Sequence, residues 1–342
     1  MPGVVQVVVF SNFEGWPHPK SAGAIVRWFD ACARAHPEVR WTHLYNPAYL
    51  LIGREEIAAT EKVFSPYLLD AQDAGRAEIG LHIHPFYDLI RAMGVDPIGT
   101  PFAGDPSDAC DTPRSPGDDA SGGYDVLMTG YAPEDRAAIL DVSIGAFLCR
   151  GFRRPRTFCA GYSAADPPLQ AMLARKRFTS SFAAQHVLPG QYGRCWHRLL
   201  EWSGRITPLT IPYRVSRHTI LPPPHPPAEH LDLVEIPLNM GVDASDIGFE
   251  GGIVSRERMF DLHCDWTGEH GTKTAVAIGV HADQVRGEPW PDGPIARTLN
   301  GFLHHVSRRA QAGDVVIENA TASEVAERFR ENTAVGSVPH PE

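Results

Sequence analysis

Two histidines placed two residues apart, His82 and His84, are the side chains of this sequence best suited to binding a metal ion. They stand in the run 80–85, Gly-Leu-His-Ile-His-Pro, whose apolar composition is typical of a β-strand that ends at a proline. Side chains two apart on an extended strand project to the same face, where two neutral imidazoles can bind one divalent ion. A lone His-x-His pattern is a weak signal, because most histidines are solvated or hydrogen-bonded core residues.

Two more predicted strand ends carry side chains that could act with this pair. The run 11–16, Ser-Asn-Phe-Glu-Gly-Trp, contains Glu14, and the run 279–283, Gly-Val-His-Ala-Asp, contains His281. In a parallel α/β barrel the carboxyl ends of the strands meet at one face, where active sites lie. Glu14 is the natural third ligand. A set of two histidines and one carboxylate leaves positions open for water and substrate, as a catalytic metal site requires.

The elements that must position these residues are visible as an alternation of apolar, β-branched runs with segments of helical period. This alternation is typical of βα units around a parallel sheet. Strands are predicted over 4–10, 39–44, 77–84, 156–160, 178–182, 233–238, 274–280 and 315–318, and residues 196–220 alternate like antiparallel strands. Helices are predicted over 22–35, 55–74, 133–148, 168–175, 255–266, 295–311 and 323–332. The fold class is therefore α/β.

The length of 342 residues suits one α/β barrel with loop insertions, so we expect a single domain over 1–342. Residues 94–123 are rich in Asp, Pro, Gly and Ser and have no hydrophobic period. We expect a long loop insertion there, which follows the histidine pair closely. It is either a lid over the site or a neutral surface insertion.

Composition excludes several classes of partner. The formal net charge of −10 leaves no basic excess to neutralise nucleic-acid phosphates. No run approaches the roughly 20 apolar residues that a membrane span needs, and the run 4–10 is too short for the apolar part of a signal peptide. We expect a soluble, cytoplasmic protein with no nucleic-acid or membrane partner. The six cysteines lack Cys-x-x-Cys spacing, which favours reduced thiols over disulfides or a zinc ribbon.

Several of these segments together resemble the polysaccharide deacetylases, the NodB-like or carbohydrate esterase family 4-like superfamily, as a divergent member. The run 78–85 resembles the histidine motif, with a spacing shorter than the usual His-x-x-x-His, and 12–16 resembles the motif whose acidic pair supplies a base and a metal ligand. The run 158–163 resembles the third motif, while 233–237 and the strand ending at His281 stand in the places of the fourth and fifth. The resemblance spans residues 4 to 285.

This resemblance implies a distorted (β/α) barrel of the NodB type, and a divalent metal, Zn²⁺, held by Glu14, His82 and His84. Two positions depart from the family pattern. Asn12 stands where the family has its catalytic Asp base, and an amide cannot accept a proton at neutral pH. Cys159 stands where the family has the Arg that pairs with that Asp. Losing both partners together avoids an unpaired buried charge, so the site looks coherently rebuilt.

The implied function is a metal-dependent hydrolase that deacylates an N-acylated sugar or small amide, a carbon–nitrogen bond that is not a peptide. His281 is the implied acid, and Asp283 and His18 are the candidates for a replacement base. Asp283 would share the face of His281 on an extended backbone, or it would cap a helix.

Three residues near the motifs, Trp16, Cys159 and Tyr162, are candidates to line a substrate pocket, with burial in the core as the alternative for each. A nucleophile or a third soft ligand is a further possible role for Cys159. The alternative function is a catalytically altered or silent barrel that binds a sugar or small metabolite, because the usual Asp and Arg are replaced by Asn12 and Cys159.

Overall fold

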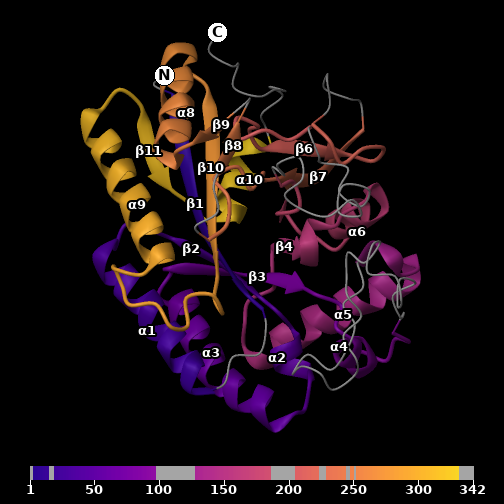
Figure 1. Ribbon diagram of the computed structural model, residues 1–342. Coiled ribbons are helices and arrows are strands. Elements are labelled where there is room, and N and C mark those ends of the chain that lie inside the picture. The colour runs from indigo at the N-terminus through magenta and orange to yellow at the C-terminus, as the bar shows by residue number, and fades with distance from the viewer. Residues whose placement is uncertain are drawn as a thin grey trace.

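The computed structural model describes residues 3–14, 19–97, 128–185, 205–222, 229–243, 247–249 and 252–330. Strands and helices alternate along these ranges, as the sequence predicts (Figure 1). The strands are β1 (Val4–Phe13), β2 (Trp41–Tyr45), β3 (Ala77–Ile83), β4 (Thr157–Ala160), β5 (Ser180–Ser181), β6 (Tyr213–Ser216), β7 (His230–Glu235), β8 (Ile247–Phe249), β9 (Gly252–Val254), β10 (Lys273–His281) and β11 (Val316–Asn319). The helices are α1 (Pro19–Ala35), α2 (Ala48–Leu51), α3 (Glu55–Asp73), α4 (Tyr87–Ala92), α5 (Pro133–Arg150), α6 (Pro167–Arg175), α8 (Arg256–His270), α9 (Pro294–Ala312) and α10 (Ala322–Phe329).

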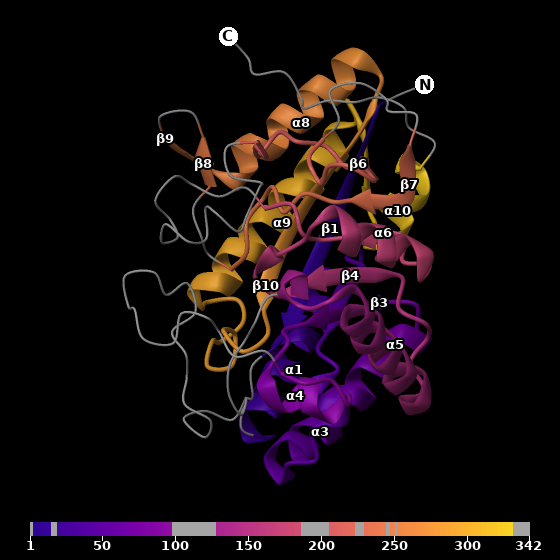
Figure 2. The same ribbon diagram turned by 90° about the vertical axis from the view of Figure 1, so that its right-hand side faces the viewer.

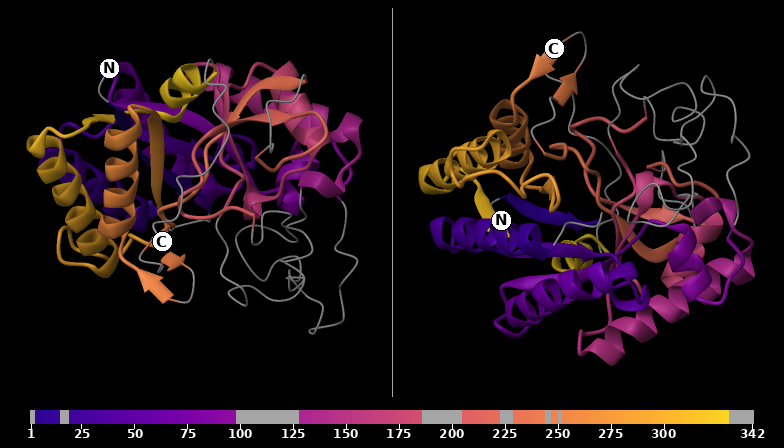
Figure 3. Two further views of the ribbon diagram at one scale, coloured as in Figure 1. Left: turned by 90° about the horizontal axis from the view of Figure 1, so that it is seen from above. Right: turned by 60° about the horizontal axis from the view of Figure 1, so that its bottom comes forward.

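Nine of the described strands form one curled sheet in a mixed α/β fold. Its order is β10-β1-β2-β3-β4-β5-β7-β6, with β11 paired to the first residues of β1. The pairs are parallel except for β6 with β7. Helices α1, α3, α5 and α9 pack around the outside of the curl (Figures 2 and 3). The carboxyl ends of the parallel strands therefore gather at one end of the sheet.

Several helices begin at a proline and end at a glycine. Pro133 and Pro294 are the first residues of α5 and α9, where the missing N–H has no helical partner to lose. Gly151 and Gly313 follow the same helices with φ of 98° and 75°, a left-handed backbone that costs glycine little. These residues explain why the predicted and observed helix ends differ by only a few positions.

Side chains alternate between the two faces of β1. Val7 and Val9 face the core beneath the outer helices, whereas Val8 and Phe10 face the interior of the curl. The inner cluster consists of Val8, Phe10, Leu44, Cys159, Phe182, Val234, Ile236, Leu238, Ala275, Ala277, Ala320, Ala322, Val325, Ala326 and Phe329. The same alternation directs Asn12, two residues after Phe10, towards the interior. An interior packed in this way is a filled core that supports the residues at the strand ends.

The irregular segment 236–243 connects the β5 side of the sheet to β10. Leu238 donates its backbone N–H to Ala184 O at 2.8 Å, and Met240 donates to Ala277 O at 3.0 Å. Gly279 of β10 donates back to Gly241 O at 3.1 Å. The segment therefore lies between the two sides of the curl, although it is not a regular strand.

Most of the predicted elements are confirmed, and the differences have local causes. The strand predicted over 178–182 is regular only at Ser180–Ser181, because the next two free backbone N–H groups bind the Glu235 carboxylate instead of a neighbouring strand. Helices α2 and α4 and the β8–β9 hairpin were not predicted. The antiparallel pairing expected in 196–220 is present at β6, while 196–204 lies outside the described residues. The loop expected over 94–123 lies outside them from residue 98 onwards.

No helix in the described part of the chain is long and apolar enough to cross a membrane. A cytoplasmic location stays a prediction from the sequence. Cys32, Cys149, Cys159 and Cys264 are unpaired thiols.

Glu235 is a carboxyl group with no exposed surface, placed on β7 between inward-facing Val234 and Ile236. One oxygen accepts hydrogen bonds from the backbone N–H groups of Ala183 at 2.6 Å and Ala184 at 2.7 Å. Burial raises the pKa of Glu235 to about 7, although these hydrogen bonds act in the opposite direction.

We expect Glu235 to make the stability of the protein depend on pH. The folded pKa of about 7 lies above the ordinary 4.5, so its contribution is present below pH 4.5 and is lost as pH rises through 7. Because one pH unit corresponds to 1.36 kcal/mol, the free energy of unfolding should fall by at most roughly 3 kcal/mol. Glu235→Gln keeps an accepting oxygen and should flatten the free energy of unfolding between pH 5 and 8, measured by urea denaturation. Exposed Glu269→Gln is the matched control. If the free energy of unfolding changed with pH in the same way in the natural protein and in both variants, the expectation would be contradicted.

Candidate metal centre

Three side chains from two strand ends converge on one point. Glu14 directly follows β1, while His82 lies near the end of β3 and His84 just beyond it. Glu14 Oε2 is 2.5 Å from His82 Nε2 and 2.7 Å from His84 Nε2. One ligand atom from each residue lies within 4.8 Å of the other two. The structure thus brings together the three residues that the sequence predicts as metal ligands.

A backbone carbonyl fixes the ring of His82. Its Nδ1 lies 3.1 Å from Cys159 O, and a carbonyl can only accept, so Nδ1 carries the hydrogen and Nε2 carries a lone pair. Burial lowers the pKa of His82, although the Glu14 carboxylate acts to raise it. The lowered pKa favours the neutral ring. A lone pair then faces a carboxylate oxygen at 2.5 Å, a repulsive contact unless a proton or metal cation lies between them. The donor set therefore fits a cation.

The ring of His84 depends on a glycine beneath it. A Cβ at Gly161 would lie 2.7 Å from His84 Nδ1, closer than real Cβ contacts, so a side chain at 161 would displace the ring. The ring also stacks on Phe86, with centroids 5.5 Å apart and planes at 16°. Glycine in the run 158–163 is thus explained by the space that His84 needs.

Glu14 is held ready as an anion. Burial raises its pKa, but the charge of His84 and the close contacts with both imidazoles hold the pKa well below its usual range. Tyr49 donates its hydroxyl to the Glu14 carbonyl at 3.3 Å, which ties the residue after β1 to α2. A charged carboxylate beside a neutral imidazole is what a divalent metal ion needs.

A second pair, His281 and Asp243, faces the same carboxylate. His281 ends β10, and its Nδ1 lies 2.7 Å from Asp243 Oδ2, while Asp243 Oδ1 accepts the His281 backbone N–H at 2.8 Å. The other ring nitrogen, Nε2, lies 3.2 Å from Glu14 Oε1. Burial lowers the pKa of His281, but the Asp243 hydrogen bond and the Glu14 charge outweigh it and raise the pKa to about 9. His281 can therefore carry a proton to this site at neutral pH.

Asn12 completes this side of the site. Its side chain is 6% exposed, and Nδ2 lies 3.5 Å from His281 Nε2. Its Oδ1 is buried with no hydrogen-bond partner among the described residues. The amide therefore offers a free acceptor beside Glu14 and His281.

Comparison with solved structures identifies the fold. A "putative polysaccharide deacetylase" from Mycobacterium smegmatis matches with a TM-score of 0.53 and 13% identity over 100% of this chain and 96% of its own. A "putative glycoside hydrolase/deacetylase" from Parabacteroides distasonis matches with a TM-score of 0.54 and 14% identity, over 96% of this chain and 72% of its own. This chain shares their fold. No model of a known protein family and no curated protein sequence matches it.

The segment after β10 differs from the sequence prediction. Asp283 was expected on an extended backbone with His281, or as a helix cap, but β10 ends at His281 and residues 282–287 form turns. Both expectations are wrong, because Gln284 donates its backbone N–H to His281 O at 3.1 Å, which closes a turn, and α9 begins only at Pro294. Burial and the charge of Glu14 raise the pKa of Asp283, so its carboxyl group still lies within the electrostatic reach of the site.

The remaining predicted residues are less directly placed. Trp16 and His18 lie outside the described residues, as does the side chain of Tyr162. The Cys159 thiol is 2% exposed in the inner cluster, the buried role that the sequence left open, and burial raises its pKa well above its usual value. In the place of the fourth motif, Glu235 lies between inward-facing residues and binds Ala183 and Ala184 instead of the site.

Asp243 was missed by sequence reasoning. It follows β7 by eight residues, in the irregular segment 236–243, and its φ of 56° is a left-handed conformation that Asp adopts more readily than most residues. The signal that could have found it is the pair Gly241 and Asp243 after a predicted strand. Glycine and aspartate are typical of a turn, and this turn ends in a carboxylate.

Proposed function

We propose that this chain is a metal-dependent hydrolase that removes an acyl group from a carbohydrate or a small amide, with the metal held by Glu14, His82 and His84. The contact of two imidazole nitrogens with one Glu14 oxygen, at 2.5 and 2.7 Å, carries this proposal. Two nitrogen ligands and one carboxylate favour Zn²⁺. The deacetylase-like fold supports a carbohydrate substrate. We propose further that the bond cleaved is an amide.

The bound cation would supply Lewis acidity for the attack of water on an acyl carbonyl. His281 then acts as the acid that gives a proton from Nε2 to the departing amine, because that nitrogen faces the centre of the site. Asp243 holds Nδ1 and so keeps the ring in the orientation that presents Nε2. Asn12 accepts a hydrogen bond through Oδ1 from the water or the substrate, since its amide cannot take the proton itself.

We assign the base to Asp283. Its carboxyl group lies within the electrostatic reach of both Glu14 and His281. Its raised pKa makes its carboxylate a better proton acceptor than an ordinary Asp. It lies in the turn directly after β10, two residues beyond His281.

Asp283→Asn should lower kcat by about 100-fold or more, with the metal content unchanged, because the amide keeps the size of the side chain but cannot accept a proton. Exposed Asp292→Asn, in the same connection before α9, is the matched control. An Asp283→Asn protein with normal kcat would mean that the proton goes elsewhere, and would remove Asp283 from the mechanism.

The segment 236–243 supports the further proposal of a distorted (β/α) barrel of the deacetylase type. Its hydrogen bonds to Ala184 and Ala277 lie where a last strand would close the ring. With such a ring, residues 1–342 form one domain whose site occupies the carboxyl ends of the strands.

Metal analysis joined to an acyl-release assay tests the proposal. We expect about one divalent ion per chain, and acetate release from N-acetylated sugars that stops with a chelator and returns with Zn²⁺. Release from O-acetylated sugars alone would support a hydrolase and correct the bond from amide to ester. Full turnover in a metal-free protein would contradict the proposal.

Asn12 in the base position favours one alternative, a barrel that binds a sugar or small metabolite without turning it over. This alternative predicts binding of N-acetylated sugars by calorimetry with no acetate release under any divalent ion tested. Asn12→Asp would then create acyl release where the natural protein has none.

A further inference from the structure

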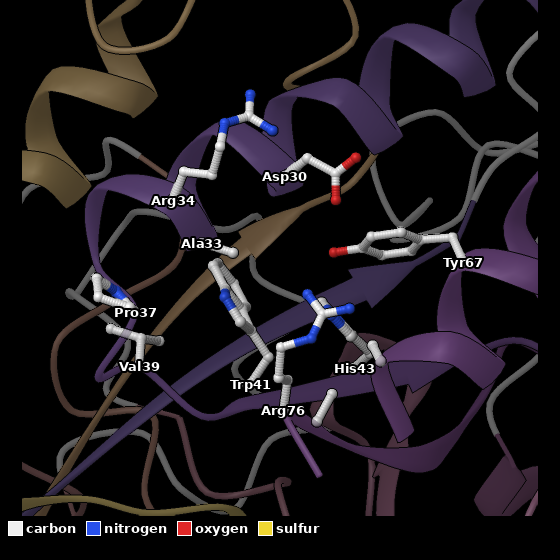
Figure 4. A pocket seen from close by; sticks show the side chains of 11 residues that line it. Asp30, Ala33, Arg34, Pro37, Val39, Trp41, His43, Tyr67 and Arg76 are labelled. Carbon is white, nitrogen blue, oxygen red and sulfur yellow. The ribbon is translucent and has the colours of Figure 1, made fainter. Parts of the chain in front are cut away.

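A cavity lies on the outer face of the sheet, between the last turns of α1 and α3 (Figure 4). Its volume is about 340 Å³, within the range of pockets that hold small molecules. It opens over the first residues of β2 and β3, whereas Glu14 follows the last residue of β1 and His82 lies near the end of β3. The cavity is therefore separate from the metal centre and takes no part in the chemistry proposed above.

The floor of the cavity is aromatic. Trp41 and His43 stack with ring centroids 5.4 Å apart and planes at 11°, and Tyr67 of α3 lies 5.9 Å from the His43 ring. Trp41 is 3% exposed and His43 is 1% exposed. Because the two rings face each other, the floor presents mainly ring edges to the cavity, and a planar ligand can contact these edges.

Two ring nitrogens in this floor lack partners. Trp41 Nε1 and His43 Nε2 are buried with no hydrogen-bond partner in the part of the chain that the structure describes. The other nitrogen of His43 is occupied, because Nδ1 lies 2.6 Å from Ser11 Oγ. Burial and the nearby Arg76 charge lower the pKa of His43 to about 3, so the ring is neutral. Buried polar groups in native proteins are normally satisfied, and these two adjoin a cavity that can hold the missing partner.

The rim of the cavity carries mainly positive charge. Arg34 ends α1 and Arg76 precedes β3, and both are exposed at the mouth together with the half-buried Asp30. No described carboxylate forms an ion pair with either guanidinium, Asp30 included. Two guanidinium groups and an indole N–H supply many donors against one carboxylate, so the complementary ligand is rich in acceptors and negatively charged.

We propose that this cavity binds a small planar organic anion of the aromatic carboxylate class. The ring of the ligand lies against Trp41 and His43, and its carboxylate binds the guanidinium of Arg76, whose charge acts on His43. A carboxylate matches the planar donor pair of a guanidinium, which explains an anion of this shape better than a point charge. Such a ligand also brings acceptor oxygens to the indole N–H, which a purely apolar guest would leave unpaired.

Calorimetry with benzoate, 4-hydroxybenzoate and indole-3-carboxylate tests the proposal on the whole chain. At least one should bind with a millimolar or tighter Kd, and the corresponding neutral amide should bind at least about tenfold more weakly, since it loses the charge-assisted pair. Arg76→Gln should weaken the carboxylate on the order of tenfold. Arg175→Gln, an exposed arginine on α6, is the matched control and should bind as the natural protein does. Because Arg76 is exposed, its replacement should not affect folding, which the melting temperature checks.

A second measurement follows the indole N–H of Trp41 in the floor of the cavity. The indole N–H resonance that disappears in Trp41→Phe should shift when the carboxylate is added to the natural protein. If no carboxylate of the three binds or moves this resonance, the cavity holds water only and the proposal is overturned. Equal affinity for acid and amide, or an unchanged affinity in Arg76→Gln, also overturns it. None of these results depends on metal content or acyl release, so the proposed function stands or fails separately.

Discussion

The double variant His82→Ala, His84→Ala should contain almost no divalent ion and should lose acyl release by at least about a thousandfold. Both imidazole nitrogens that contact Glu14 Oε2 are removed, so a single carboxylate remains, which is too little to hold Zn²⁺. A Lewis acid contributes several kcal/mol to such a reaction, and each 1.36 kcal/mol is a factor of ten in rate. The measurements are metal content by mass spectrometry and acetate release under saturating substrate.

The matched control replaces two exposed histidines, His218, which lies beside Glu229, and His270, which ends α8. This protein should keep both its metal and its activity. Alanine at position 82 removes the imidazole donor from Cys159 O, so circular dichroism must check that the double variant remains folded. A normal metal content in the His82 and His84 variant would place the metal elsewhere and remove the proposed centre.

The sequence predicts this much of the centre because its signals are local. The alternation along β1 directs even-numbered residues inward, and the spacing of His82 and His84 directs both rings to one face of β3. The contact of Glu14 with both rings follows once β1 and β3 lie in one parallel sheet with only β2 between them. Pattern and topology together are sufficient for these three residues.

The remaining features depend on backbone groups and on irregular segments, which leave no periodic signal. The partner of His82 Nδ1 is a carbonyl, and any residue at 159 would supply one. The partner of His281 is 38 residues away in sequence, in a segment with no regular strand. The turn at 282–287 cannot be told from a strand by composition alone, which is why the geometry predicted for Asp283 was wrong.

His281→Ala should lower kcat by about 100- to 10,000-fold while the metal content and KM change little, because the variant loses the proton donor but no metal ligand. Asp243→Asn should lower kcat by a smaller factor, because Asp243 is a positioning residue that acts through the His281 ring. The imidazole in that variant still faces Glu14, 3.2 Å away in the natural protein. Normal kcat in His281→Ala, with the metal present, would exclude His281 as the acid.

The pH profile separates the two roles. An acid must be protonated, so kcat should fall as pH rises through the pKa of His281, which the Asp243 hydrogen bond and the Glu14 charge raise to about 9 against the effect of burial. A cation on Glu14 offsets part of that charge and moves this falling limb of the kcat–pH profile to lower pH. In Asp243→Asn the limb should move lower still, because a neutral amide stabilises the imidazolium less than a carboxylate does at 2.7 Å. A limb at the same pH in both proteins would mean that Asp243 only fills space, and that the proton comes from another group.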